Sequence, residues 1–183
     1  MLVKQLISMR PDSAIITSLD LRGKRIKGCA ACYRCQGDPV NYGCIIKDDM
    51  QDLVTQILDS DLMIWATPIY EWSVPSPLKA LWDRMFGLYK YYQLDLASGL
   101  YTKIKGVSLN AGKRIALLTT SGYPANLAAD LLDETLKRYA RYARMDYRGL
   151  YGVQSGRVND MTVYEDKEVI AGLQLFWSQM LQN

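Results

Sequence analysis

Apolar residues along this chain follow two alternating spacings. Short runs such as LMIWAT at residues 62–67 and IALL at residues 115–118 are almost continuously apolar, which is typical of strands buried on both faces of a parallel sheet. Between such runs, apolar residues recur every three or four positions, which places them on one face of an amphipathic helix. This alternation predicts the α/β fold class, with a doubly wound parallel sheet.

The predicted order of elements starts on a helix and then alternates to a closing helix. A chain of 183 residues has the usual length of one domain, so we expect a single domain over residues 1–183. Asp48 and Asp49 stand where the second helix begins, a position at which carboxylates satisfy free backbone amides. The helices are expected at residues 2–9, 47–61, 77–92, 126–143 and 164–181, and the strands at 13–21, 62–67, 114–118 and 145–153.

The composition excludes several functional classes. The chain contains no histidine, which removes Ser-His-Asp and Cys-His catalysis and every histidine metal ligand. The net charge is only +3 and basic residues are mixed with acids, so we expect no nucleic-acid partner, and we interpret the basic segment 136–148 as a solvated helix face. Because no apolar run suits a membrane helix and the N-terminus does not resemble a secretory signal, we expect a cytoplasmic protein with reduced thiols and no membrane partner.

Two loops follow strands at the edge of the sheet where ligands of open α/β folds bind. In the first loop, Tyr70 and Trp72 can supply a stacking wall for a flat heteroaromatic ring, and Pro68 restricts the backbone. The alternative for each aromatic residue is packing beneath the next helix. Amides and hydroxyl groups that can bond the oxygens and nitrogens of such a ring are offered by Thr67, Ser73, Thr120, Ser121 and Gly122.

All four cysteines lie in one segment, CAACYRCQGDPVNYGC at residues 29–44. Thiolates in the spacing C-x2-C-x2-C-x8-C can converge on a [4Fe-4S] cluster. Four sulfur ligands also suit zinc, although structural zinc sites usually present two separated pairs, and a redox disulfide is a further alternative. The remaining interpretation is that reduced thiols fill the loop as small apolar groups. The sequence leaves these alternatives open for Cys29, Cys32, Cys35 and Cys44.

Several motifs occur in a specific order between about Ile26 and Tyr123. The segment CAACYRC…GCIIKDDM is followed by a helix, a buried strand, the run ATPIYEWSVPSPLKALWDR and later LLTTSGY. In this order and at these intervals, the motifs resemble the NAD(P)H-dependent FMN reductase family, which includes the iron-sulfur flavoproteins. Each motif alone is weak, whereas their combination is specific.

The resemblance implies a flavodoxin-like fold with parallel strands in the order 2-1-3-4-5. It also implies an enzyme in which NAD(P)H reduces FMN and FMN reduces a quinone, free flavin or another small acceptor, so that no protein acid or base is nominated. A homodimer or homotetramer is implied too, and a [4Fe-4S] cluster at the cysteines would relay electrons to or from FMN. One side of the flavin ring would be lined by Pro68, Ile69, Tyr70, Glu71, Trp72 and Ser73, and the other by Thr120, Ser121, Gly122 and Tyr123.

The N-terminal end of the chain departs from the family pattern. Members begin with a strand and a loop rich in Gly and Ser, whose amides and following helix bind the FMN phosphate. This chain starts at MLVKQLISM, which matches the helix after that loop, so strand 1 is expected to be absent. Its absence would leave a gap of about 10 Å between the strands at 13–21 and 62–67. We expect residues upstream of Met1 to complete the sheet, with a rearranged sheet or a second chain as alternatives.

A non-enzymatic protein is the alternative function. In this interpretation, a flavodoxin-like scaffold that has lost its phosphate loop serves as a binding or interaction protein. The aromatic insertion FGLYKYYQLDLASGLYTKIKG at residues 86–106 motivates it, because such an insertion can cover a partner subunit. The same tyrosines and leucines can instead cover the flavin.

Overall fold

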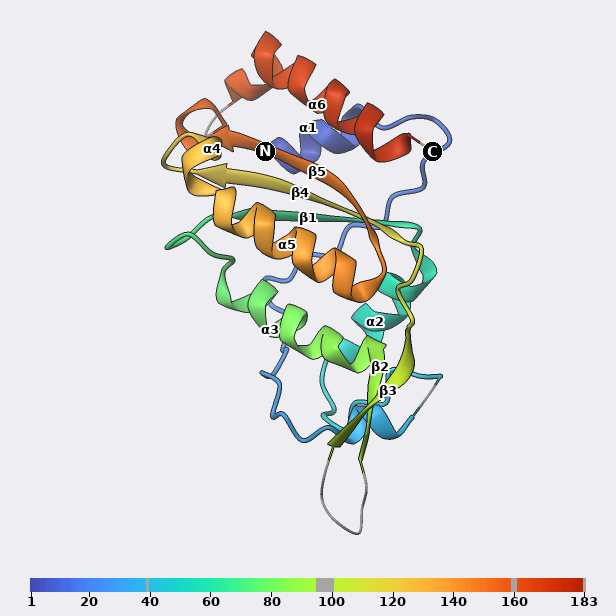
Figure 1. Ribbon diagram of the computed structural model, residues 1–183. Coiled ribbons are helices and arrows are strands. Elements are labelled where there is room, and N and C mark those ends of the chain that lie inside the picture. The colour runs from blue at the N-terminus through green and yellow to red at the C-terminus, as the bar shows by residue number, and fades with distance from the viewer. Residues whose placement is uncertain (39, 95–100, 159–160, 183) are drawn as a thin grey trace.

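The computed structural model describes residues 1–38, 40–94, 101–158 and 161–182. Its larger sheet consists of three parallel strands in the order β1-β4-β5 (Figure 1), which are formed by Leu62–Pro68, Arg114–Ser121 and Asp146–Gln154. A helix follows each strand and returns over the sheet. This is the doubly wound α/β arrangement that the apolar pattern predicts.

Helices cover both faces of this sheet, and each face carries a hydrophobic core (Figure 1). The first core lies under α2 (Met50–Asp59), α3 (Ser76–Arg84) and α5 (Asp130–Ala143), and the second under α1 (Leu2–Ser8) and α6 (Lys167–Leu181). Along β4, Ile115 and Leu117 enter the first core, whereas Ala116 and Leu118 enter the second. A strand sends successive side chains to opposite faces, so a continuous apolar run is needed where both faces are covered.

The remaining elements are short. They are η1 (Arg34–Gly37), η2 (Met85–Leu88), α4 (Ala125–Ala128), η3 (Ser155–Arg157) and η4 (Met161–Tyr164). Among the helices that the structure describes, none combines the length and the apolar character needed to span a membrane.

The strand expected at residues 13–21 is not formed, and this prediction is wrong. The segment contains no strand; Ile15 is 98% exposed, while Leu19 and Leu21 pack against the first core. An extended segment needs a neighbouring strand to satisfy its backbone groups. No strand of the described residues pairs with the free edge of β1. Of the order 2-1-3-4-5, the described residues therefore form strands 3, 4 and 5.

The helix expected to reach residue 92 ends at Arg84, which corrects a second prediction. The chain then forms a hairpin of β2 (Tyr89–Leu94) and β3 (Tyr101–Ser108). Aromatic residues favour strands, and pairing with β3 makes residues 89–92 part of a strand instead of the predicted helix. Gly106 permits this pairing, because a Cβ atom at that position would lie 1.5 Å from the carbonyl oxygen of Lys90. Residues 95–100 of the aromatic insertion lie outside the described residues.

Candidate functional site

The two loops predicted to bind a ring lie next to each other in the structure. β1 and β4 are parallel neighbours, with Pro68 opposite Thr120, and the amide of Ile69 donates to the carbonyl oxygen of Thr120 at 2.8 Å. Both loops therefore leave the same edge of the sheet at adjacent strand ends. We call this surface, formed by residues 67–73 and 120–123, the carboxyl edge.

A tight turn presents two aromatic rings at the carboxyl edge. The backbones of Tyr70 and Ser73 exchange two hydrogen bonds of 3.0 Å, and the residues between them, Glu71 and Trp72, have φ angles of +48° and +56°. Such angles cost free energy in residues other than glycine. The turn leaves Tyr70 63% exposed and Trp72 54% exposed. The alternative that these aromatic residues pack beneath the next helix is therefore wrong, whereas Ile69 does pack against the first core.

The second loop adds a third exposed ring. Ser121 Oγ donates to the carbonyl oxygen of Tyr123 at 2.7 Å, and Gln154 Nε2 donates to that of Gly122 at 2.9 Å. These two bonds hold the loop while Tyr123 stays 66% exposed. The hydroxyl group of Thr67 is also engaged, since it donates to the carbonyl oxygen of Pro68 at 2.9 Å.

Backbone amides supply free donors at the carboxyl edge. In the described part of the chain, the amides of Glu71, Trp72, Gly122 and Tyr123 donate to no protein acceptor. Amide donors beside exposed aromatic rings suit a flat ring that carries oxygen and nitrogen acceptors. An isoalloxazine ring has this chemistry, so the residues present fit the ring of FMN.

A glycine that the sequence did not single out positions the second loop. Gly152 on β5 lies opposite Thr119 on β4. A Cβ atom at Gly152 would lie 2.4 Å from Ala125 Cβ and 2.8 Å from Thr119 Oγ1. The missing side chain lets α4 pack directly on the sheet, immediately after the loop. A glycine inside a strand is the signal that could have found it, since it often marks a close approach of another segment.

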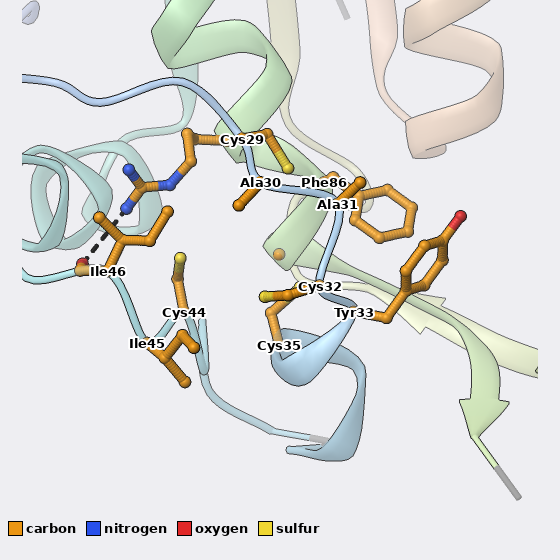
Figure 2. A pocket seen from close by; sticks show the side chains of 12 residues that line it. Cys29, Ala30, Ala31, Cys32, Tyr33, Cys35, Cys44, Ile45, Ile46 and Phe86 are labelled. Carbon is orange, nitrogen blue, oxygen red and sulfur yellow. Dashed lines mark hydrogen bonds between the residues drawn. The ribbon is translucent and has the colours of Figure 1, made fainter. Parts of the chain in front are cut away.

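The four cysteines surround one small space (Figure 2). Cys29, Cys32, Cys35 and Cys44 line a cavity of about 20 Å³ together with Phe86 and Arg84. A cavity of this size holds about one water molecule, and no three Cys, Asp or Glu side chains of the described residues are arranged as metal ligands. The donor chemistry suits a cluster, but a [4Fe-4S] cube does not fit this arrangement of the thiols.

A buried ion pair closes the base of the cysteine segment. Arg84 Nη1 lies 2.9 Å from Asp48 Oδ2, and the two side chains are 1% and 4% exposed. Arg84 also donates to the carbonyl oxygen of Lys27, and Asp48 accepts from the amide of Lys27, both before the first cysteine. Burial alone would raise the pKa of Asp48, but the hydrogen bonds from Arg84, Lys27 and Met50 outweigh it and lower that pKa. Asp48 thus does more than the helix capping that its position predicts.

The hairpin anchors the other side of the cysteine segment. Lys90 is 3% exposed, and its Nζ donates to the carbonyl oxygens of Cys35 at 2.7 Å and Tyr42 at 3.4 Å. Gln36 Nε2 donates to the carbonyl oxygen of Tyr89 at 2.7 Å. Burial lowers the pKa of Lys90 and raises that of the Cys35 thiol. The loop is therefore held by hydrogen bonds to its backbone, and Cys35 is kept in its thiol form.

These contacts predict two fast and two slow thiols. Cys29 and Cys32 are exposed, whereas Cys35 and Cys44 are partly buried, and the thiolate is the reactive form. We expect Ellman's reagent to modify Cys29 and Cys32 first, as judged by mass spectrometry of the labelled peptides. Lys90→Met removes the bonds to the carbonyl oxygens of Cys35 and Tyr42, and we expect the freed loop to expose Cys35 and accelerate its modification, although the charge of Lys90 by itself lowers the pKa of that thiol. Lys113→Met is the matched control, because Lys113 binds the carbonyl oxygens of Leu58 and Ser60. Labelling of Cys35 ahead of Cys29 would contradict this expectation.

A family profile for the flavodoxin-like fold matches residues 13–172. This chain belongs to that flavodoxin-like family. The FMN-dependent NADH-azoreductase of Bacillus anthracis superposes with a TM-score of 0.56 over 96% of this chain and 88% of that chain, at 16% sequence identity. The likeness confirms the flavodoxin-like fold expected from the motifs.

Sequence relatives of this flavodoxin-like chain include two kinds of flavoprotein. An iron-sulfur flavoprotein of Methanocaldococcus jannaschii is 30% identical over 112 residues, which are 61% of this chain and 56% of that protein. An FMN-dependent NADH:quinone oxidoreductase of Stenotrophomonas maltophilia is 31% identical over 74 residues, which are 40% of this chain and 34% of that protein. The chain spans between 31% and 58% of the first four curated relatives that it matches.

Proposed function

We propose that this flavodoxin-like protein is an FMN-dependent NAD(P)H oxidoreductase that passes electrons to a quinone, free flavin or another small acceptor. The observation that carries the proposal is the carboxyl edge, where three exposed aromatic rings stand beside four free amides. The relatives named for FMN-dependent reduction of quinones support the cofactor and the reaction class.

The residues of this chain would bind, orient and shield the flavin ring. Tyr70 and Trp72 would form one wall, and Tyr123 would stand at the opposite loop. The amides of Glu71, Trp72, Gly122 and Tyr123 would donate hydrogen bonds to the two carbonyl oxygens and the unprotonated nitrogens of the ring, which accept them. FMN, when bound, would accept hydride from NAD(P)H and hand electrons to the acceptor. Because the cofactor supplies this chemistry, no side chain is assigned as an acid or base.

Titration with FMN tests the proposal. We expect purified protein to bind FMN, to release it on denaturation, and to oxidise NADH or NADPH only when FMN is present. Trp72→Ala should raise the dissociation constant of FMN by about 2-fold to 12-fold, the equivalent of one aromatic contact of roughly 0.5–1.5 kcal/mol. Leu175→Ala removes a side chain of α6 that is 59% exposed and should leave binding unchanged. A colourless protein that takes up no added FMN would reject the proposal.

A non-enzymatic interaction protein is the second candidate. It is favoured by the free edge of β1, which no described strand covers, since an uncovered edge can pair with another chain. It predicts no FMN binding together with a stable homodimer, homotetramer or complex, which sedimentation would detect. If the protein forms such an assembly and also binds FMN, the result would favour the oxidoreductase.

The iron-sulfur cluster also stays a proposal. The four cysteines and the relatives named iron-sulfur flavoproteins support it, and the small cavity requires that the loop opens to admit a cluster. Anaerobic purification followed by iron and acid-labile sulfide assays tests it. Absence of both elements would leave zinc, reduced thiols or a disulfide as the interpretation of this segment.

A further inference from the structure

A row of aromatic rings crosses the first core from the sheet to the end of α5. Trp82 on α3 contacts Tyr139 on α5 at a ring-centroid distance of 5.4 Å, and α3 and α5 lie side by side (Figure 1). Trp65 on β1 contacts both rings, at 4.8 and 5.6 Å. Tyr139 also contacts Tyr89 of the hairpin at 5.9 Å, and Tyr89 contacts Tyr142 at 5.4 Å. Aromatic pairs in contact have centroid distances of about 4.5–7 Å, so these residues form one continuous path, which we call the aromatic row.

Both ends of the aromatic row reach solvent. At one end, Trp82 lines a groove of about 300 Å³ between α3 and α5, together with Trp72 of the carboxyl edge. At the other end, Tyr142 is 42% exposed. Between the two ends, Tyr89 and Trp65 are buried. The row therefore joins the groove beside the carboxyl edge to a second surface through buried and partly buried rings.

Two hydroxyl groups of the aromatic row share a hydrogen bond. Tyr89 Oη donates to Tyr139 Oη, and Tyr139 Oη donates to Met85 Sδ at 3.5 Å. Burial raises the pKa of both phenols, so both are protonated at neutral pH. A phenol that loses an electron also loses its proton, and the Tyr139 oxygen is then stabilised by the proton that Tyr89 donates. The pair can therefore hold a neutral radical and avoids the cost of a buried charge.

We propose that the aromatic row carries one-electron oxidation from the groove tryptophans to the Tyr89–Tyr139 pair, and that it thereby protects Trp72 and Trp82 from permanent oxidation. Indole and phenol rings are among the protein side chains that lose an electron most readily. The tyrosyl radical is more stable than the tryptophanyl radical at neutral pH, so the transfer runs from tryptophan to tyrosine.

The transfer is balanced in electrons and protons. A one-electron oxidant at the groove removes an electron from Trp82, and its indole nitrogen releases a proton. One electron then passes from Tyr139 to Trp82, while the indole nitrogen takes up a proton and the tyrosine pair releases one. A small thiol such as glutathione returns one electron and one proton to the pair. The transfer itself rests on the rings alone, whereas oxidation that starts from a flavin at the carboxyl edge rests on the proposed oxidoreductase function.

Pulse radiolysis with azide radicals tests the transfer in the full chain without FMN. Azide radicals oxidise tryptophan in preference to tyrosine, and transient absorption distinguishes the two product radicals. We expect the tryptophanyl signal to decay as the tyrosyl signal rises, at a rate that does not depend on protein concentration. Tyr139→Phe keeps the ring but removes the oxidisable hydroxyl group, so the coupled phase should be lost.

Tyr151→Phe is the matched control. It also removes one hydroxyl group, which donates to the carbonyl oxygen of Val169 at 3.3 Å, but its ring packs against the second core on the opposite face of the sheet. The coupled phase should be unchanged in this variant. The proposal would be overturned by a tryptophanyl signal that decays without a rise of the tyrosyl signal, or by an equal coupled phase in folded Tyr139→Phe.

A second variant covers the case in which Tyr139→Phe does not fold. Tyr89→Phe keeps Tyr139 but removes the hydrogen bond that would stabilise its radical. We expect a slower coupled phase with unchanged circular dichroism. An unchanged rate in Tyr89→Phe would overturn the tyrosine pair as the site that holds the radical.

Blue light connects the aromatic row with the proposed function, because illuminated FMN is a one-electron oxidant. With FMN bound and glutathione present, Tyr139→Phe should accumulate oxygen on Trp72 and Trp82 faster than the natural sequence or Tyr151→Phe, as peptide mass spectrometry detects. Equal oxidation of the three proteins would overturn the protective role. If FMN does not bind, the oxidoreductase proposal fails, while pulse radiolysis still decides whether the row transfers an electron.

Discussion

Replacing Arg84 by Met lowers the free energy of unfolding by about 3–5 kcal/mol, the usual cost of removing one partner from a buried ion pair. The change leaves the Asp48 carboxylate, whose side chain is 4% exposed, without its counter-charge. It also removes bonds to the carbonyl oxygens of Lys27 and Ile46, on either side of the cysteines. Urea unfolding measures the loss. Arg138→Met removes an exposed ion pair on α5 and should leave the midpoint almost unchanged.

The partner variant tests whether the charge itself is responsible. Asp48→Asn combined with Arg84→Met removes both charges, so the double variant should be more stable than Arg84→Met alone. If the double variant loses the sum of the two single losses, the two residues act independently and the ion-pair explanation fails.

Acid should weaken the ion pair between Arg84 and Asp48. The pKa of Asp48 is lower in the folded protein than its value of about 3.9 in an unfolded chain. The pair therefore contributes its full stability above about pH 4, and this contribution is lost as pH falls through the lower folded pKa. In urea unfolding between pH 5 and pH 2, the natural sequence should lose more stability than the double variant. Equal losses would assign acid sensitivity to other carboxylates.

Gly152→Ala has the second large expected effect, because it places a methyl group between β5 and α4. Restoring an ordinary contact of about 3.5–4.0 Å from the 2.4 Å to Ala125 Cβ requires α4 to shift by about 1.1–1.6 Å. The overpacking should cost about 1–3 kcal/mol of unfolding free energy. The shift also displaces Gly122 and Tyr123, just before α4, so the dissociation constant of FMN should rise about tenfold, which equals about 1.4 kcal/mol.

An identical change at Gly156 is the control. A Cβ atom there would meet nothing within 4 Å, so Gly156→Ala should change neither unfolding nor FMN binding. Full FMN affinity in Gly152→Ala would show that FMN binding by the second loop does not depend on how closely α4 packs on the sheet. Loss of stability with unchanged affinity would limit Gly152 to a role in packing.

The sheet and its helices could largely be predicted because their signals are local. The apolar runs at 62–67 and 114–118 became strands, since burial of a sheet leaves few polar positions, and the more polar segment at 145–153 also became a strand. The prediction failed at residues 13–21 and beyond Arg84, where the conformation depends on a partner strand. Residues 13–21 have no neighbouring strand to satisfy their backbone groups and form no strand, whereas the backbone of residues 89–94 pairs with β3.

The sequence by itself determined the fold class, the two loops at adjacent strand ends and the gathering of the cysteines, because apolar spacing and short separations act locally. Only the tertiary structure decided that Tyr70 and Trp72 face solvent, that Gly152 seats α4, and that Arg84 reaches Asp48 across 36 positions. The small cavity between the thiols and the groove between α3 and α5 were also decided there. These features depend on contacts between distant segments, whose geometry exists only after the sheet, helices and hairpin have packed together.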